Sequence, residues 1–189
     1  MTIGPLIGTV PWFVPGMVVT IALATLLCTR VGRWLDAGPV RAWWLMAALG
    51  SALVVTLTPQ RDAVERGVIG SGACDLSRLW LAPLDFYLGP NDAAENILLF
   101  VPLGIAIAFL GGRTRRVAIA AGVLLPVVIE LLQSQVTILN RSCESADVVD
   151  NLAGLLIGLG IGGMMTILVT LVQEARRARE ARVRARRGT

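Results

Sequence analysis

The sequence of 189 residues contains no histidine and no lysine, so all 17 of its basic residues are arginine. Without histidine, the chain cannot use histidine as an acid or base, form a Ser-His-Asp triad or build a zinc site with histidine ligands. Charged residues make up only 16% of the chain, whereas 55% of its residues are hydrophobic. Together with a mean hydropathy of +0.71, this composition is typical of a small polytopic membrane protein.

Several sequence motifs are also absent. The chain has no glycine-rich loop in a βαβ context and no pair of CxxC motifs, so we expect no haem, flavin or nucleotide cofactor. Its net charge of +4 comes without any nucleic-acid recognition motif, so we expect no nucleic-acid partner.

Five apolar stretches are long enough, or nearly so, to cross roughly 30 Å of hydrocarbon. They cover about residues 11–29, 42–58, 94–111, 117–139 and 148–172. No arginine precedes Arg30, so the first stretch lacks the basic n-region of a signal peptide and we expect it to be retained. The sequence predicts an all-α fold, with one membrane domain of five helices over residues 1–172.

The arginines indicate the orientation of these helices. Thirteen of the 17 follow the first, third or fifth stretch: Arg30, Arg33, Arg41, Arg113, Arg115, Arg116, Arg176, Arg177, Arg179, Arg182, Arg184, Arg186 and Arg187. The positive-inside rule then places the N-terminus outside and the C-terminus in the cytoplasm of a multi-pass protein of the bacterial plasma membrane. We expect the basic tail, residues 173–189, to continue the fifth helix as a topology anchor attracted to anionic lipid, or to bind a cytoplasmic partner.

Two cysteines fall in the loops that this topology places outside. Cys74 lies in the long loop of residues 59–93 and Cys143 in the short loop of residues 140–147, where an oxidising compartment lets disulfides persist. We therefore predict a Cys74–Cys143 disulfide that ties the long loop to the fourth and fifth helices. The long loop also mixes aromatic and apolar side chains, so it either covers polar groups as a lid or anchors at the membrane interface.

Polar side chains occur inside the last three apolar stretches, where ionisable groups are costly and usually functional. The third stretch opens with Asn96 and contains Pro102, which removes a backbone donor and favours a local kink. In the fourth, Glu130 and Gln133 share one helical face. Glu130 lies about ten residues before the outer loop, which predicts a depth of roughly 15 Å. It either serves a function there or makes a structural hydrogen bond between helices.

The fifth stretch carries a narrow stripe on one helical face. Asp147, Asn151, Gly154, Gly158 and Gly162 are spaced by four, three, four and four residues, so they align at 100° per residue. The glycines allow close backbone approach, and the polar end of the stripe favours an inward-facing helix. Asp147 and the neighbouring Asp150 can alternatively cap the helix N-terminus.

The order of these motifs resembles the VanZ-like family of membrane proteins, which is named for a protein linked to teicoplanin resistance. The resemblance covers about residues 42–165. It rests on Asn96-x-x-Leu-Phe-x-Pro-Leu-Gly, Glu130-x-x-Gln133, Arg141 and Asp147-x-x-x-Asn151-x-x-Gly154-x-x-x-Gly158. Arg141-Ser142-Cys143, taken with Cys74, is similar to actinobacterial members. The signature positions that carry over are Asn96, Pro102, Gly104, Glu130, Gln133, Arg141, Asp147, Asn151 and Gly154. The resemblance supplies no reaction.

Three classes of function remain open. In the first, an outward-facing pocket binds a lipid headgroup, a cell-wall precursor or a glycopeptide. Its candidate ligand-binding residues are Asn96, Glu130, Gln133, Arg141, Asp147, Asp150 and Asn151. In the second, an intramembrane enzyme uses Glu130 as acid or base, with Asp147, Asp150 and Asn151 as oxygen ligands of Mg²⁺ or Ca²⁺. In the third, a structural subunit uses its polar groups only to lock the helices.

Overall fold

The computed structural model describes residues 11–89 and 91–187, with side chains as far as Glu180. Its long helices are α2 (Phe13–Trp34), α3 (Pro39–Leu57), α5 (Asp92–Ala108), α6 (Gly112–Gln135) and α7 (Ser145–Arg187). Short elements occupy the connections: helix α4 (Arg61–Arg66), the 3-10 helices η1 (Leu84–Leu88) and η2 (Thr137–Leu139), and the two-residue strands β1 (Cys74–Asp75) and β2 (Cys143–Glu144). The predicted helical architecture is confirmed.

Four of these helices, within the residues described, are long and apolar enough to cross a membrane: α2, α3, α6 and α7 as far as Glu180. Helix α5 has 17 residues, which gives a length of about 26 Å at 1.5 Å per residue. It ends early because the chain turns at Gly111 and Gly112, and Gly112 adopts a φ of +49° that favours glycine. Of the five predicted spans, four therefore meet the length of a membrane span, and α5 is shorter.

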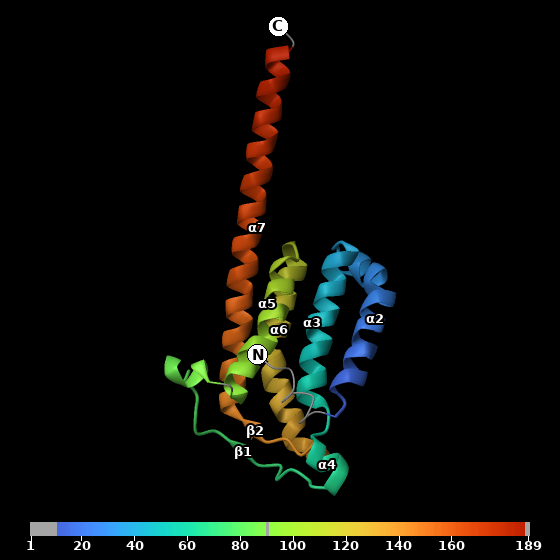
Figure 1. The fold of residues 1–189 in the computed structure, drawn as a ribbon, viewed down its shortest axis with the longest axis vertical. Helices are drawn as coiled ribbons and strands as arrows, with labels where there is room; N and C mark the ends of the chain where they lie inside the picture. Colours follow the sequence, from blue (N-terminus) through green and yellow to red (C-terminus); the bar gives the residue numbers. More distant parts are fainter. Residues whose placement is uncertain (1–10, 90, 188–189) are drawn as a thin grey trace.

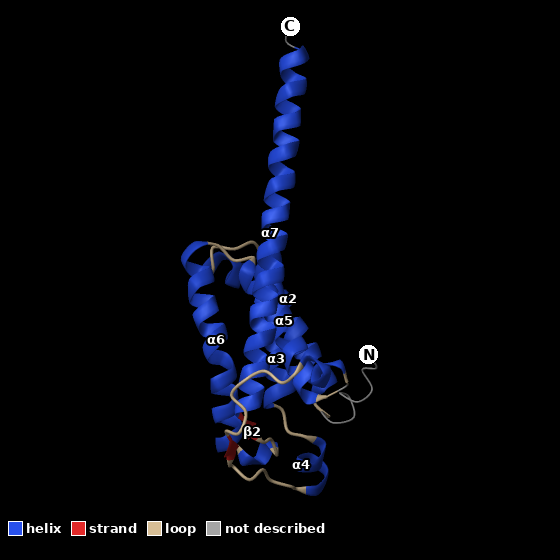
Figure 2. Ribbon diagram, turned by 90° about the vertical axis from the view of Figure 1, so that its left-hand side faces the viewer, coloured by secondary structure: helices blue, strands red, loops and turns tan. Residues whose placement is uncertain are grey.

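The long helices lie side by side as a bundle (Figures 1 and 2). Helices α5 and α7 approach most closely, because glycines face each other across their contact. A Cβ atom on Gly158 would meet the Val101 carbonyl oxygen and the Cα atom of Gly104. The buried apolar core lies beside this contact and draws on α3, α5, α6 and α7: Ala48, Ala52, Phe100, Leu103, Ile107, Ile129 and Leu155.

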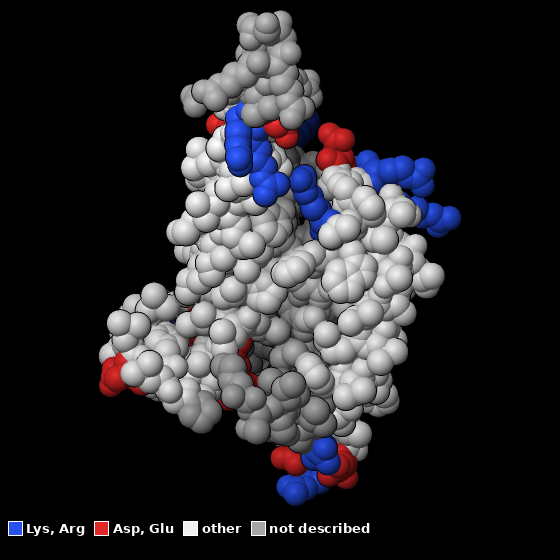
Figure 3. All heavy atoms as spheres, turned by 45° about the horizontal axis from the view of Figure 1, so that its top comes forward, with Lys and Arg blue, Asp and Glu red and all other residues white. Residues whose placement is uncertain are grey.

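The two ends of the bundle differ in charge. One end, called the basic end here, holds the α2–α3 turn, the α5–α6 turn and the continuation of α7; arginine side chains gather there (Figure 3). The other, called the loop end, holds residues 58–89 and 136–144, and α4 places both signs of charge on it. Between the two ends most of the visible surface is uncharged (Figure 3).

Helix α7 extends well past the other helices at the basic end (Figure 1). It contains 43 residues, which corresponds to a length of about 65 Å. The sequence predicted that the fifth helix begins near residue 148, but α7 begins at Ser145, directly after β2. The tail from residue 173 to Arg187 is part of the same helix, as the sequence predicted.

Candidate functional site

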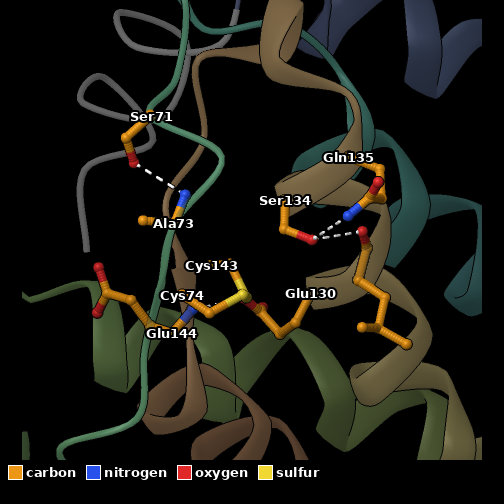
Figure 4. Close-up of a disulfide and its surroundings, with 9 residues drawn as sticks. Ser71, Ala73, Cys74, Glu130, Ser134, Gln135, Cys143 and Glu144 are labelled. Atoms are coloured by element: carbon orange, nitrogen blue, oxygen red, sulfur yellow. Dashed lines mark hydrogen bonds between the residues drawn. A yellow bond between two sulfur atoms is a disulfide. The ribbon is translucent and has the colours of Figure 1, made fainter.

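A disulfide joins the two loops at the loop end. Strands β1 and β2 pair in parallel, with Cys74 opposite Cys143 and Asp75 opposite Glu144. The two cysteines form the predicted disulfide, with their Cα atoms 4.5 Å apart (Figure 4). This covalent link holds the long outer loop against the segment that leads into α7.

Replacing both cysteines with serine is expected to lower the free energy of unfolding by about 2 kcal/mol, at the low end for a disulfide. The cost is small because hydrogen bonds also hold the loop, including the one from the Gly70 N–H to the Thr137 carbonyl. Thermal unfolding of the purified protein, with and without a reductant, measures this effect. If reduction leaves the unfolding midpoint unchanged, the disulfide contributes nothing to stability.

Glu130 lies close to this disulfide (Figure 4). Its side chain is buried, and one carboxylate oxygen accepts a hydrogen bond of 2.8 Å from the backbone N–H of Glu144. The predicted depth of roughly 15 Å is wrong, because α6 already ends at Gln135 and the turn of η2 follows. Five residues separate Glu130 from the helix end, about 8 Å at 1.5 Å per residue. Glu130 therefore positions the segment that carries the disulfide.

Gln133 and Arg141 both bind the C-terminal end of α3. The Gln133 amide donates to the Thr56 carbonyl at 2.9 Å. The Arg141 guanidinium donates to the Val55 carbonyl at 2.6 Å and to the Thr58 carbonyl. Carbonyls at a helix C-terminus lack partners within the helix and attract cations, and burial lowers the pKa of Arg141. These two side chains thus connect α3 to α6 and to the short outer loop.

Asp150 is fully buried and pairs with the long loop, whose residue Arg78 lies 72 positions earlier. The Arg78 guanidinium donates to both carboxylate oxygens, at 2.5 and 3.3 Å. The Tyr87 hydroxyl donates to Asp150 at 2.7 Å and accepts from the Ala82 N–H at 3.0 Å. The Asp150 carboxylate raises the pKa of Arg78 by hydrogen bonding to the charged guanidinium.

Sequence reasoning missed Arg78 and Tyr87 as partners of the polar cluster. One signal for them existed, because a buried carboxylate such as Asp150 requires a cation nearby. Arg78 lies between Asp75 and an aromatic segment of an outer loop, and Tyr87 is the only tyrosine in the chain. The long loop is therefore fastened to the first turns of α7.

A cavity of about 390 Å³ lies between this loop and the first turns of α5 and α7. Four acidic residues line it: Asp75, Asp92, Glu144 and Asp147. Among the described residues that line it, Arg78 is the one basic side chain, and its charge is already paired with Asp150. The N–H of Ser77 donates to Asp75 at 2.8 Å and lowers the pKa of that carboxyl, which favours its charged form. The cavity is therefore strongly acidic.

The family model of VanZ/LLP1 matches residues 45–168, about two thirds of the chain. The chain belongs to the VanZ/LLP1 family. No curated protein matches it, and no solved structure does. Together with the apolar helices, the match identifies a VanZ/LLP1 membrane protein.

The structure distributes the predicted site residues of this VanZ/LLP1 protein over three places. Asp147 lines the acidic cavity, and the Asn96 side chain lies near its carboxylate. Asp150 lies under the long loop, whereas Glu130, Gln133 and Arg141 lie on the α6 side. Asn151 is 1% exposed, and in the described part of the chain its side-chain oxygen has no hydrogen-bond partner.

The glycines of the stripe in the VanZ/LLP1 protein lie against α5. A Cβ atom on Gly154 would meet the Ile97 carbonyl oxygen, and one on Gly162 would lie 2.6 Å from the Ala108 Cβ atom. The Pro102 carbonyl of α5 accepts a 3.2 Å hydrogen bond from the Trp44 indole of α3. Within the described residues no three Asp, Glu or Cys side chains gather closely enough to hold a metal ion.

Proposed function

We propose that this VanZ/LLP1 protein lies in the bacterial plasma membrane and binds a positively charged group in the acidic cavity at its loop end. The group is an amine carried by a lipid headgroup, a cell-wall precursor or a glycopeptide. The observation that carries the proposal is the set of four carboxylates around one cavity in which Arg78, the one arginine among the described lining residues, is already paired.

The chemistry of the cavity favours an amine over a phosphate or carboxylate. An ammonium group offers three hydrogen-bond donors, and carboxylates are the acceptors that bind it most strongly. Arg141, one of the predicted ligand-binding residues, donates to the carbonyls of Val55 and Thr58 instead. A negatively charged group in the cavity would meet Asp75, Asp92 and Asp147 without a free cation among the described lining residues.

The orientation of the cavity follows from charge and from redox chemistry. The arginine clusters lie together at the basic end, and the positive-inside rule assigns such an end to the cytoplasm. The disulfide lies at the loop end, and disulfides persist in oxidising compartments outside the cytoplasm. Both arguments support a cavity that opens to the outer surface.

The double variant Asp75→Asn/Asp92→Asn is expected to lose amine binding and keep its fold, because both side chains are exposed and asparagine preserves their size. Thermal unfolding in detergent measures binding, since a ligand of the native state raises the midpoint by mass action. The probes are phosphatidylethanolamine, an amine-bearing wall-precursor analogue and teicoplanin, each compared with its N-acetylated form.

Asp85→Asn is the matched control, because Asp85 is an exposed carboxylate of the same loop that does not line the cavity. The proposal requires at least one amine to raise the midpoint for the native protein and for Asp85→Asn, with a smaller shift for the double variant. If no amine raises the midpoint, or if the N-acetylated probes act equally well, the proposal is refuted.

One observation favours a structural role as the second candidate. Glu130, Gln133 and Arg141 each bind backbone groups of another segment, as residues that only lock a bundle would. If the role is structural, Glu130→Gln lowers the unfolding midpoint, and the cavity variants leave the midpoint unchanged with or without an amine. The enzymatic alternative, with Glu130 as acid or base, requires a substrate to reach that carboxyl, whereas Glu130 does not line the acidic cavity and accepts a hydrogen bond from the Glu144 N–H.

A contribution to teicoplanin resistance is the part of the proposal that rests on the family alone. It follows from the cavity if the glycopeptide, or the precursor that it recognises, supplies the amine. Comparing growth of a deletion strain complemented with the native or double-variant gene, over a range of teicoplanin concentrations, tests that link. Equal growth of the two complemented strains would show that the cavity does not contribute to resistance.

A further inference from the structure

The segment Leu79–Leu88 of the long outer loop exposes an unusual number of large apolar side chains. Leu84 and Leu88 are 84% and 86% exposed, and Leu79 and Trp80 are 68% and 66% exposed. The segment contains only one charged residue, Asp85. Six large apolar residues form this surface, called the loop crest here: Leu79, Trp80, Leu81, Leu84, Phe86 and Leu88.

The loop crest is held in place from its other side. Arg78 and Tyr87 flank or belong to the segment and both bind the buried Asp150. The Ser145 hydroxyl donates to the Arg78 carbonyl at 2.8 Å. Arg78 and Tyr87 therefore hold the segment against α7, and its large apolar side chains remain exposed.

The position of the crest separates it from the rest of the outer loop. Helix η1 lies beside the outer ends of α5 and α7, at the level of their first turns, whereas α4 lies beyond the ends of the long helices (Figure 1). The first turns of α7 lead into a membrane-spanning surface on which Leu156 is 63% exposed. The crest thus lies beside the start of a helix that is long and apolar enough to cross the membrane.

We propose that the loop crest inserts into the interfacial layer of the outer leaflet and brings the acidic cavity to the level of the lipid headgroups. Non-helical backbone is not tolerated in the hydrocarbon, so the segment belongs at the interface, where tryptophan is enriched. Its single carboxylate, Asp85, faces the headgroups and water. The partner that the crest contacts is the lipid bilayer.

This placement defines the class of ligand, and in that respect it rests on the proposed function. Phe86 belongs to the crest and also lines the cavity. A cavity that shares a wall with an inserted segment opens at the membrane surface. It takes the polar head of an amphiphile that is anchored in the outer leaflet, in preference to a soluble amine.

Fluorescence quenching of Trp80 in lipid nanodiscs tests the insertion. The contribution of Trp80 is the difference between the native protein and Trp80→Phe, because the chain has five tryptophans. A nitroxide on the lipid headgroup or high on the acyl chain is expected to remove most of this difference signal. Aqueous iodide is expected to remove little of it. Strong quenching by iodide with none by the lipid nitroxides would overturn the proposal.

A charged variant tests the crest as a surface. Leu84→Glu/Leu88→Glu is expected to make Trp80 accessible to iodide. Val64→Glu, on the exposed face of α4 beyond the bundle, is expected to leave Trp80 protected. Formation of the Cys74–Cys143 disulfide, seen by gel mobility, reports that each variant folds.

The two proposals fail in different ways. A protected Trp80 in a protein that binds no amine leaves the interface proposal standing and refutes the proposed function. Amine binding by a protein whose Trp80 is open to iodide leaves the proposed function standing and refutes the interface proposal. Protection of Trp80 from iodide by a second copy of the chain or by a soluble protein, with no quenching by the lipid nitroxides, would also refute membrane insertion.

Discussion

Replacing Arg78 with methionine is expected to lower the free energy of unfolding by about 3–5 kcal/mol, the cost of removing one partner of a buried ion pair. Asp150 is fully buried, and Arg78 is its only ion-pair partner among the described residues. The Tyr87 hydroxyl would remain as a single hydrogen-bond donor to that carboxylate. The long outer loop is then expected to separate from α7.

Denaturant unfolding of the purified protein in detergent measures the loss. The double variant Arg78→Met/Asp150→Asn is expected to recover part of it, because asparagine removes the unpaired charge and can still accept from Tyr87. Arg66→Met is the control, since Arg66 and its partner Asp62 are exposed and such pairs contribute about 0–1 kcal/mol. Equal losses for Arg78→Met and Arg66→Met would show that the buried pair does not hold the loop.

Gly154→Val is expected to be the second severe change, with a loss of about 3 kcal/mol, the upper end for overpacking a core. The added Cβ atom would meet the backbone carbonyl of Ile97, which has no rotamer in which to avoid it. Helices α5 and α7 would have to move apart, and the first turns of both helices line the cavity. Amine binding is therefore expected to fall together with stability.

Gly160→Ala separates this clash from the general cost of changing a glycine in α7. Gly160 belongs to the same helix, and nothing lies within 4 Å of a Cβ atom added there. Alanine favours a helix over glycine by up to about 1 kcal/mol, so stability should hold or rise. Thermal unfolding of both variants makes the comparison. An unfolding midpoint that Gly154→Val leaves unchanged would mean that α5 and α7 do not pack so closely.

The helices could be predicted from the sequence because apolar length and periodicity are local properties. The stretches placed at 42–58 and 94–111 correspond to α3 (Pro39–Leu57) and α5 (Asp92–Ala108) within a few residues. The ends were less predictable. The sequence extended the fourth stretch to residue 139, but α6 ends at Gln135 and η2 follows as a separate turn. That difference produced the wrong depth for Glu130.

The site could be predicted only in part. The topology alone brought Cys74 near Cys143, because both fell in outer loops, and this prediction is confirmed. The acidic lining was not predicted beyond Asp147. Asp75 and Asp92 belong to loops or helix starts whose relative positions depend on long-range contacts, chiefly the pair of Arg78 with Asp150, and no local pattern encodes such contacts.

The disulfide, the Arg78–Asp150 pair and the close α5–α7 contact all position the walls of one cavity. Cys74 precedes Asp75, Cys143 precedes Glu144, and Asp147 and Asp150 occupy the first turns of α7. Each variant that is expected to lower stability is therefore also expected to change amine binding in the cavity. A variant that lowers stability without changing amine binding would indicate that the two are independent.

The most direct test of the account is a competition for lipid, followed by native mass spectrometry of the protein released from detergent. The protein is mixed with equal amounts of phosphatidylethanolamine and its N-acetylated derivative. The account predicts that the native protein and Asp85→Asn retain the free amine preferentially, and that Asp75→Asn/Asp92→Asn loses the preference. Equal retention of the two lipids by the native protein, or an unchanged preference in the double variant, would contradict binding of a lipid amine in the cavity.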